Sequence, residues 1–269
     1  MNSGGSRVER LVLAGCLVAG IAGAWQLGFG GRRWEPAPPQ DHTRRDEYHF
    51  LRMEYKDMRW TRRGAGFPGW WRQDWPEADA HFTQGIQRLT RIHVGEPRHL
   101  PLLDDRIFEY PWLYATQTGY WDLTEAEKKR LREYLLRGGF LVTDDFHGPQ
   151  EWEIFAETMR GVLPEAPILE IEEGHPLLRV MYDIEERVPI PGLRHLREGP
   201  GGTITVQMQY GPPRWRAMHD SKGHLVVAIN YNMDVGDAWE HADMPEYPEA
   251  MTALAYRFGL NYIIYAMTH

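Results

Sequence analysis

The sequence predicts an α/β domain built on a mainly parallel sheet, and one segment in the middle of the chain carries the main observations. Thr124 followed by Glu127 is a capping-box pattern, which satisfies backbone donors in the first turn of a helix. Paired glycines at 138–139 suit a helix C-terminus, and the apolar run 140–142 is typical of a buried strand. We therefore predict a helix over about 124–137, between strands near 111–116 and 140–143.

A strand, a helix and a second strand within about 35 residues form a βαβ unit, whose two strands must be parallel. We expect Phe140, Leu141 and Val142 to be almost wholly buried, because the strands of parallel sheets are covered on both faces. Ligands of such sheets sit at the carboxyl ends of the strands. Here those ends carry the polar and aromatic segments 118–121 and 144–147.

The other segments continue the α/β pattern without an internal repeat. Strand-like runs cover 48–55, 168–171, 203–210 and 214–230, and the turn 220–223 divides the last run into an antiparallel pair. Helical patterns cover 76–92, 150–160 and 248–268. A loop rich in tryptophan and glycine, 56–75, separates the first strand from the first helix.

Four stretches together resemble an uncharacterised bacterial family that is known as a domain of unknown function. They are TGYWDLTEAEKKRLREYLLRGGFLVTDD (118–145), GHPLL (174–178), NYNMDVGDAWE (230–240) and NYIIYAMTH (261–269). The similarity covers about residues 46–269, and the family is grouped with the class I glutamine amidotransferase-like folds. The resemblance implies a flavodoxin-like, three-layer α/β domain with a mainly parallel sheet.

The expected nucleophile of an amidotransferase is missing from this chain. Amidotransferases place a Cys on a strand-to-helix elbow and follow it with a His and a Glu. The corresponding segment here is TDDFHG (143–148), which holds no Cys or Ser. Because this nucleophile is missing, and a fold does not by itself imply a function, we predict no catalytic residue and no cofactor.

Polar residues that follow the strands form a candidate ligand edge. Carboxylates suit Mg²⁺ or Ca²⁺, but acids after strands also cap the next helix or solvate a turn, and we predict no metal site. A His beside an Asp acts as an acid–base pair where a nucleophile or a metal accompanies it. The residues of this edge are Tyr120, Asp144, Asp145, His147, Asp234 and Asp237.

Charge and aromatic content narrow the class of partner. A net charge of −8 argues against a nucleic-acid partner, since no basic stripe is present to neutralise phosphates. The 11 Trp and 13 Tyr either fill a wide core or form a recognition surface. We predict that the aromatic loop supplies contact anchors for a protein partner, namely Trp60, Trp70, Trp71 and Trp75.

The N-terminal segment 11–29 carries no charge and is just long enough to span a bilayer as a helix. Three interpretations are open: a retained anchor, a signal peptide cleaved after Ala24, and a lipoprotein signal at Cys16. We prefer the anchor, because small residues recur at four-residue spacing and let another transmembrane helix approach closely. The predicted helix–helix interface comprises Gly15, Ala19, Gly20, Gly23 and Ala24.

These observations predict a transmembrane anchor (1–30), a proline-rich tether (31–46) and an amidotransferase-like α/β domain (47–269). We predict a single-pass protein of the inner membrane with a periplasmic domain. Its partners are other membrane subunits, and it serves as a non-catalytic accessory subunit of a larger complex, for example a photosynthetic or respiratory one. The alternative is an amidotransferase-like hydrolase or a protein that binds a small ligand such as a sugar.

Overall fold

The computed structural model describes residues 40–64, 66–185, 187–207 and 210–269. These residues belong to a single compact unit. The predicted anchor lies outside the described residues, together with Gly15, Ala19, Gly20, Gly23 and Ala24. Within the described ranges, no helix combines the length and the apolar composition that crossing a membrane requires.

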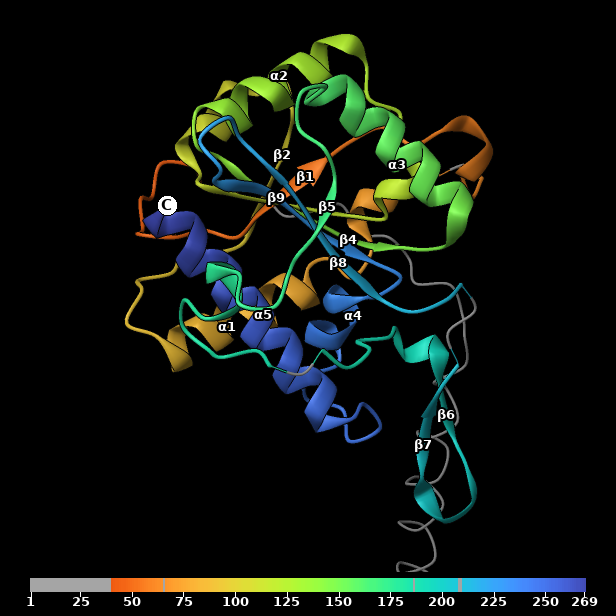
Figure 1. Ribbon diagram of the computed structural model, residues 1–269. Coiled ribbons are helices and arrows are strands. Elements are labelled where there is room, and N and C mark those ends of the chain that lie inside the picture. The colour runs from red at the N-terminus through yellow and green to blue at the C-terminus, as the bar shows by residue number, and fades with distance from the viewer. Residues whose placement is uncertain (1–39, 65, 186, 208–209) are drawn as a thin grey trace, which may run out of the picture. The chain divides into compact units, whose positions relative to one another are not determined.

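A seven-stranded sheet forms the centre of the domain (Figure 1). Its strands lie in the order β2, β1, β3, β4, β9, β8 and β5. The first five are parallel to one another, whereas β8 is antiparallel to β9 and β5 is antiparallel to β8. The strands are β1 (Leu51–Glu54), β2 (Arg98–Pro101), β3 (Trp112–Thr116), β4 (Phe140–Phe146), β5 (Leu169–Glu170), β8 (Arg214–His219) and β9 (Leu225–Tyr231).

Helices cover both faces of the sheet, so the domain has three layers (Figure 1). On one face lie α2 (Glu125–Leu136) and α3 (Gly148–Val162); on the other lie α1 (Glu77–Leu89), α4 (Val235–Glu240) and α5 (Glu249–Thr268). Side chains alternate along the strands, so Leu113 and Leu141 join the core under α2 and α3, whereas Tyr114 and Val142 join the core under α1 and α5. The predicted α/β domain with a mainly parallel sheet is confirmed.

The predicted strand–helix–strand unit is also confirmed. Strands β3 and β4 are parallel and α2 connects them, with both hydrogen bonds of the capping box formed between Thr124 and Glu127. At the other end of α2, the N–H of Gly139 donates to the carbonyl of Tyr134 (3.0 Å), and Gly138 has a left-handed φ of +95°. Phe140, Leu141 and Val142 are at most 2% exposed.

Two predicted elements differ from the structure in extent. Among its described residues, the run 203–210 contributes β7 (Ile204–Val206), which pairs with β6 (Leu196–Glu198) in a separate ribbon. Ile204 and Thr205 are exposed and so bury little against the main sheet, whereas Val206 packs against the core. The helix predicted over 76–92 ends at Leu89, since Thr90 is extended and its hydroxyl donates to the carbonyl of Ile86. Short 3₁₀ turns complete the connections: η1 (Arg59–Thr61), η2 (Trp70–Arg72), η3 (Asp105–Glu109), η4 (Thr118–Tyr120), η5 (Pro176–Leu178), η6 (Leu193–His195) and η7 (Pro200–Gly202).

Candidate functional site

Segments far apart in the chain meet at the carboxyl edge of the sheet. The side-chain amide of Gln117, at the end of β3, donates to Oδ2 of Asp145 near the end of β4. Nε2 of His147 lies 2.9 Å from Oδ1 of the same carboxylate. After β9, Oδ1 of Asn232 accepts a 3.0 Å hydrogen bond from the N–H of Gly148, the first residue of α3. These contacts hold the ends of β3, β4 and β9 together.

The backbone at this edge is unusual for residues that carry side chains. Asp74, Gln117, Asp145 and Asn232 have φ values of +62°, +52°, +49° and +58°, and they are the non-glycine residues with left-handed φ in the described part of the chain. Asn and Asp tolerate this region better than other residues do, but it still costs free energy. Such residues cluster at functional sites, where the surrounding structure holds them in place.

Carboxylates are concentrated at the same edge. Asp74, Asp145 and Asp234 are buried, and one carboxylate oxygen from each lies within 4.8 Å of those of the other two. Burial, and then neighbouring carboxylates, raise the pKa of Asp74 and that of Asp234 well above the usual range. Burial also raises the pKa of Asp144 to about 7 and that of Asp237 to about 6. The cluster therefore resists full ionisation.

Two oxygens of these acids are left without a hydrogen bond. Among the described residues, Oδ2 of Asp74 and Oδ1 of Asp144 are buried and have no hydrogen-bond partner. Gly236 allows the first turn of α4 to lie close to these acids. A Cβ at this position would lie 2.7 Å from the hydroxyl of Tyr114 and 3.1 Å from Oδ2 of Asp74. A buried acceptor without a donor costs free energy unless a proton, a water or a cation satisfies it.

A polar cavity of about 390 Å³ adjoins the acids. Tyr120 and Glu151 form part of its wall, with the tyrosine hydroxyl donating to Oε1 of Glu151 over 2.6 Å. Arg194 is 57% exposed and places Nη2 3.4 Å from Oδ1 of Asp145. Burial, and then the charge of Arg194, lower the pKa of His195 to about 4. The cavity is lined by Arg63, Trp70, Gln117, Tyr120, His147, Glu151, Arg194, His195 and Tyr210.

The four predicted interface tryptophans lie in different environments. Trp60 is 60% exposed and its ring meets Tyr120 edge-on, whereas Trp71 is half-buried. Trp70 and Trp75 are 8% and 7% exposed, so most of both rings packs inside the domain. The Trp70 indole N–H donates to the carbonyl of Thr61 over 2.9 Å. Of these four side chains, Trp60 therefore offers the largest exposed fraction to a partner.

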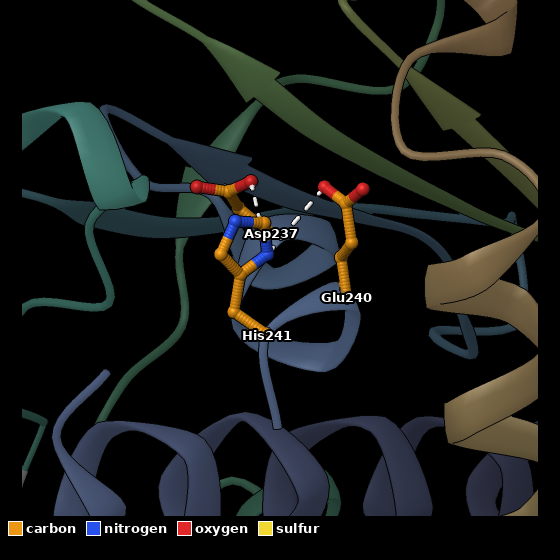
Figure 2. A group of neighbouring side chains, drawn as sticks. All are labelled: Asp237, Glu240 and His241. Carbon is orange, nitrogen blue, oxygen red and sulfur yellow. Dashed lines mark ion pairs between the residues drawn. The ribbon is translucent and has the colours of Figure 1, made fainter. Parts of the chain in front are cut away.

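Asp237 forms a second polar group with Glu240 and His241 on α4. Figure 2 shows both carboxylates turned toward the imidazole, with ion-pair distances of 3.8 Å from Asp237 and 3.5 Å from Glu240 to Nδ1 of His241. The other oxygen of Asp237 accepts the backbone N–H of Leu193. Asp237 thus ties α4 to the segment that carries Arg194. Asp234 caps α4 by accepting the N–H of Asp237 over 3.0 Å, as expected for an acid that follows a strand.

The structure brings the predicted edge residues together. Tyr120 and His147 line the cavity, while Asp144, Asp145, Asp234 and Asp237 lie in or beside the acid cluster. Sequence reasoning missed Asp74, Gln117, Glu151, Arg194 and His195. Asp74 and Arg194 come from segments without periodicity, and the one available signal was that Gln117 directly follows the strand predicted over 111–116.

Comparison with known proteins places this architecture in a family. The family model described as "Domain of unknown function (DUF4159)" matches residues 32–267. The chain belongs to the DUF4159 family. No curated protein matches the chain. In this DUF4159 domain, the segment 143–148, at which the amidotransferase resemblance implies a Cys, holds Asp145 near the end of β4, where it is buried and left-handed.

Proposed function

We propose that this chain is a binding protein whose DUF4159 domain holds a small polar ligand at the carboxyl edge of its sheet. The observation that carries the proposal is the convergence of Asp74, Gln117, Asp145 and Asn232, all left-handed, on that edge. Strained residues persist where the surrounding structure over-determines them, and they are common at ligand sites. A wholly structural edge has no need of four such positions, a buried acid cluster and an adjoining polar cavity.

The order of the strands supports the same location. Counted along the chain, the five parallel strands β2, β1, β3, β4 and β9 have the order 2-1-3-4-5, which is the order of flavodoxin-like folds. Ligands of such folds bind at the carboxyl ends, at the reversal of strand order between the first and third strands. The cavity includes Arg63, from the segment after β1, and Gln117, from the end of β3. Because of this strand order, we propose that the domain has a flavodoxin-like fold.

The lining of the cavity fits an acidic sugar. Arg63 and Arg194 supply guanidinium groups for a carboxylate or a phosphate. Gln117 and Glu151 supply amide and carboxylate groups for hydroxyls, while Trp70 and Tyr120 supply aromatic surface. The cavity volume of about 390 Å³ lies in the range of small-molecule sites. A nucleophile for acyl transfer is not placed at the elbow, so we propose binding rather than turnover.

Calorimetric titration of the full-length chain in mild detergent tests this function. The probes are glucuronate and glucose 6-phosphate, with glucose as the neutral comparison. We expect saturable binding of an acidic probe, weakened about tenfold or more in Arg194→Gln, because a charge-assisted contact is lost. Arg91→Gln removes an exposed arginine that does not line the cavity and should leave binding unchanged. Absence of binding at about 10 mM, or equal binding by Arg194→Gln, would refute the proposal.

We also propose, as a second function, that the chain is a membrane-anchored accessory subunit with a periplasmic domain. The uncharged segment 11–29 with its ridge of small residues supports this. Native purification from membranes followed by mass spectrometry tests it. We expect stoichiometric membrane subunits with the wild-type chain, and their loss when residues 1–30 are deleted. Recovery of the wild-type chain alone, or a mature protein that begins at Trp25, would contradict it.

A further inference from the structure

We propose that Asp74, Asp145 and Asp234 form a binding site for one hard divalent cation of the Mg²⁺ and Ca²⁺ class. The three side chains are buried, and an oxygen from each lies within 4.8 Å of the others. They come from three separate segments: the loop before α1, the end of β4 and the connection from β9 to α4. The proposal does not depend on the sugar ligand, since these carboxylates meet whether or not the cavity is filled.

An oxygen without a partner points to a ligand among these carboxylates. Asp74 is 3% exposed, and its Oδ1 accepts the side-chain amide of Gln73 over 2.6 Å. Its Oδ2 has no hydrogen-bond partner among the described residues. That atom lies 3.1 Å from the position that a Cβ on Gly236 would occupy, so it faces the first turn of α4, which Asp234 caps. A cation bound there would satisfy this oxygen.

The charges in the cluster are not balanced by the side chains around it. Arg194 contacts Asp145 from the solvent side, with its own side chain 57% exposed. Arg52 is already paired with Asp79 by two hydrogen bonds. One guanidinium and the imidazole of His147 therefore face three close carboxylates, with Asp144 and Asp237 nearby. Like charges at this separation repel strongly in a buried site, and a divalent cation would offset the repulsion.

The donor atoms select the class of metal. All three ligands are carboxylate oxygens, which Mg²⁺ and Ca²⁺ prefer, whereas Zn²⁺ and Cu²⁺ favour imidazole or thiolate. The group of Asp237, Glu240 and His241 fits less well, because it is only half-buried and one of its three ligands is an imidazole. We therefore assign the cation to the buried group and not to the group on α4.

Direct titration with metal alone tests the site. The full-length chain in detergent is stripped with EDTA, desalted and titrated with MgCl₂, CaCl₂ or MnCl₂ in a calorimeter, and its thermal unfolding is followed in parallel. We expect one ion per chain, a Kd below about 1 mM for at least one metal, and a rise in Tm on binding. No saturable binding of any of the three ions up to about 10 mM would overturn the proposal.

Variants then locate the ion. Asp74→Asn and Asp234→Asn each remove one charge, and both should weaken binding about tenfold or more. Asn tolerates the left-handed φ of Asp74 and caps a helix as well as Asp does, so we expect both variants to fold and to match or exceed the wild-type Tm in EDTA. Asp122→Asn, at an exposed position, is the charge-matched control. Wild-type affinity in both Asp74→Asn and Asp234→Asn would place the ion elsewhere and refute this site.

Discussion

The backbone N–H of Gly236 donates a 2.8 Å hydrogen bond to Oδ2 of Asp144, a residue 92 positions earlier in the chain. The hydroxyl of Tyr114 donates to the same oxygen over 2.9 Å. One buried carboxylate oxygen thus joins β3, β4 and the first turn of α4. This junction fixes the position of α4, and with it the position of Asp234 at the end of β9.

The first prediction concerns the close packing at Gly236. We expect Gly236→Ala to destabilise the domain by about 1–3 kcal/mol, because its Cβ would overlap the Tyr114 hydroxyl 2.7 Å away in a packed core. Urea unfolding followed by tryptophan fluorescence measures the free energy of unfolding. Gly161→Ala is the control: that helical glycine has its nearest neighbour, Lys128 Cδ, at 3.3 Å, so Ala should be neutral or slightly stabilising. Equal effects of the two changes would contradict this account.

The second prediction concerns pH. Burial raises the pKa of Asp144 from 3.8 to about 7, so between these values the folded chain holds a proton that the unfolded chain has released. Stability must then fall as the pH rises toward and through about 7. Relative to the variant Asp144→Asn, we expect the wild-type free energy of unfolding in EDTA to decrease by about 1 kcal/mol between about pH 6.5 and pH 8.5.

The comparison with Asp144→Asn removes the contribution of the histidines. Burial lowers the pKa values of His42, His49, His175, His195 and His219, so their contribution to stability increases with pH and levels off only about one pH unit above 6.5, where the unfolded chain has lost its histidine protons. That rise is common to the wild type and to Asp144→Asn, whose amide oxygen still accepts from Tyr114 and Gly236. A stability difference between the two proteins that stays constant over this window would show that Asp144 is ionised without cost.

The third prediction concerns the ion pair of Arg52 and Asp79, whose side chains are at most 1% exposed. Arg52→Met should destabilise the domain by about 3–5 kcal/mol, because it leaves a buried carboxylate unpaired. The double variant Arg52→Met/Asp79→Leu should recover at least about half of that loss, which a double-mutant cycle measures. Arg132→Met breaks an ion pair with Glu165 that is partly exposed and should cost under about 1 kcal/mol. No recovery in the double variant would show that Arg52 acts chiefly through its hydrogen bonds to the carbonyls of Trp71 and Gln73.

The fourth prediction separates the tryptophans of the aromatic loop. Trp75→Ala removes a ring that is 7% exposed and should cost about 3–5 kcal/mol of unfolding free energy. Trp60→Ala removes a ring that is 60% exposed and should change stability by less than about 0.5 kcal/mol. Thermal and chemical unfolding of the two variants give the comparison. A large loss of stability in Trp60→Ala would mean that this ring serves the core rather than a partner.

Much of the sheet was predictable because its signals are local. The Thr124–Glu127 capping box and the paired glycines at 138–139 lie within one helix and its ends, so a single sequence displays them. The parallel pairing of β3 and β4 then follows from connectivity, since a helical crossover of this length requires it. The same rule placed Asp144, Asp145 and His147 at the carboxyl edge of the sheet.

The tertiary structure alone decided how those residues act on one another. Asp74 and Arg194 belong to segments that carry no periodic pattern, and contacts made by other segments bring them to the edge. Arg194, for example, is positioned by its neighbour Leu193, whose N–H donates to Asp237. Burial also changed the chemistry that the sequence implies. From the sequence, Asp234 is expected to be a solvated helix cap, but burial beside other carboxylates raises its pKa. The sequence by itself therefore determined that β3 and β4 are parallel and which acids follow the predicted strands. Their spacing, their desolvation and the oxygens left without donors depend on long-range packing, which no local pattern encodes.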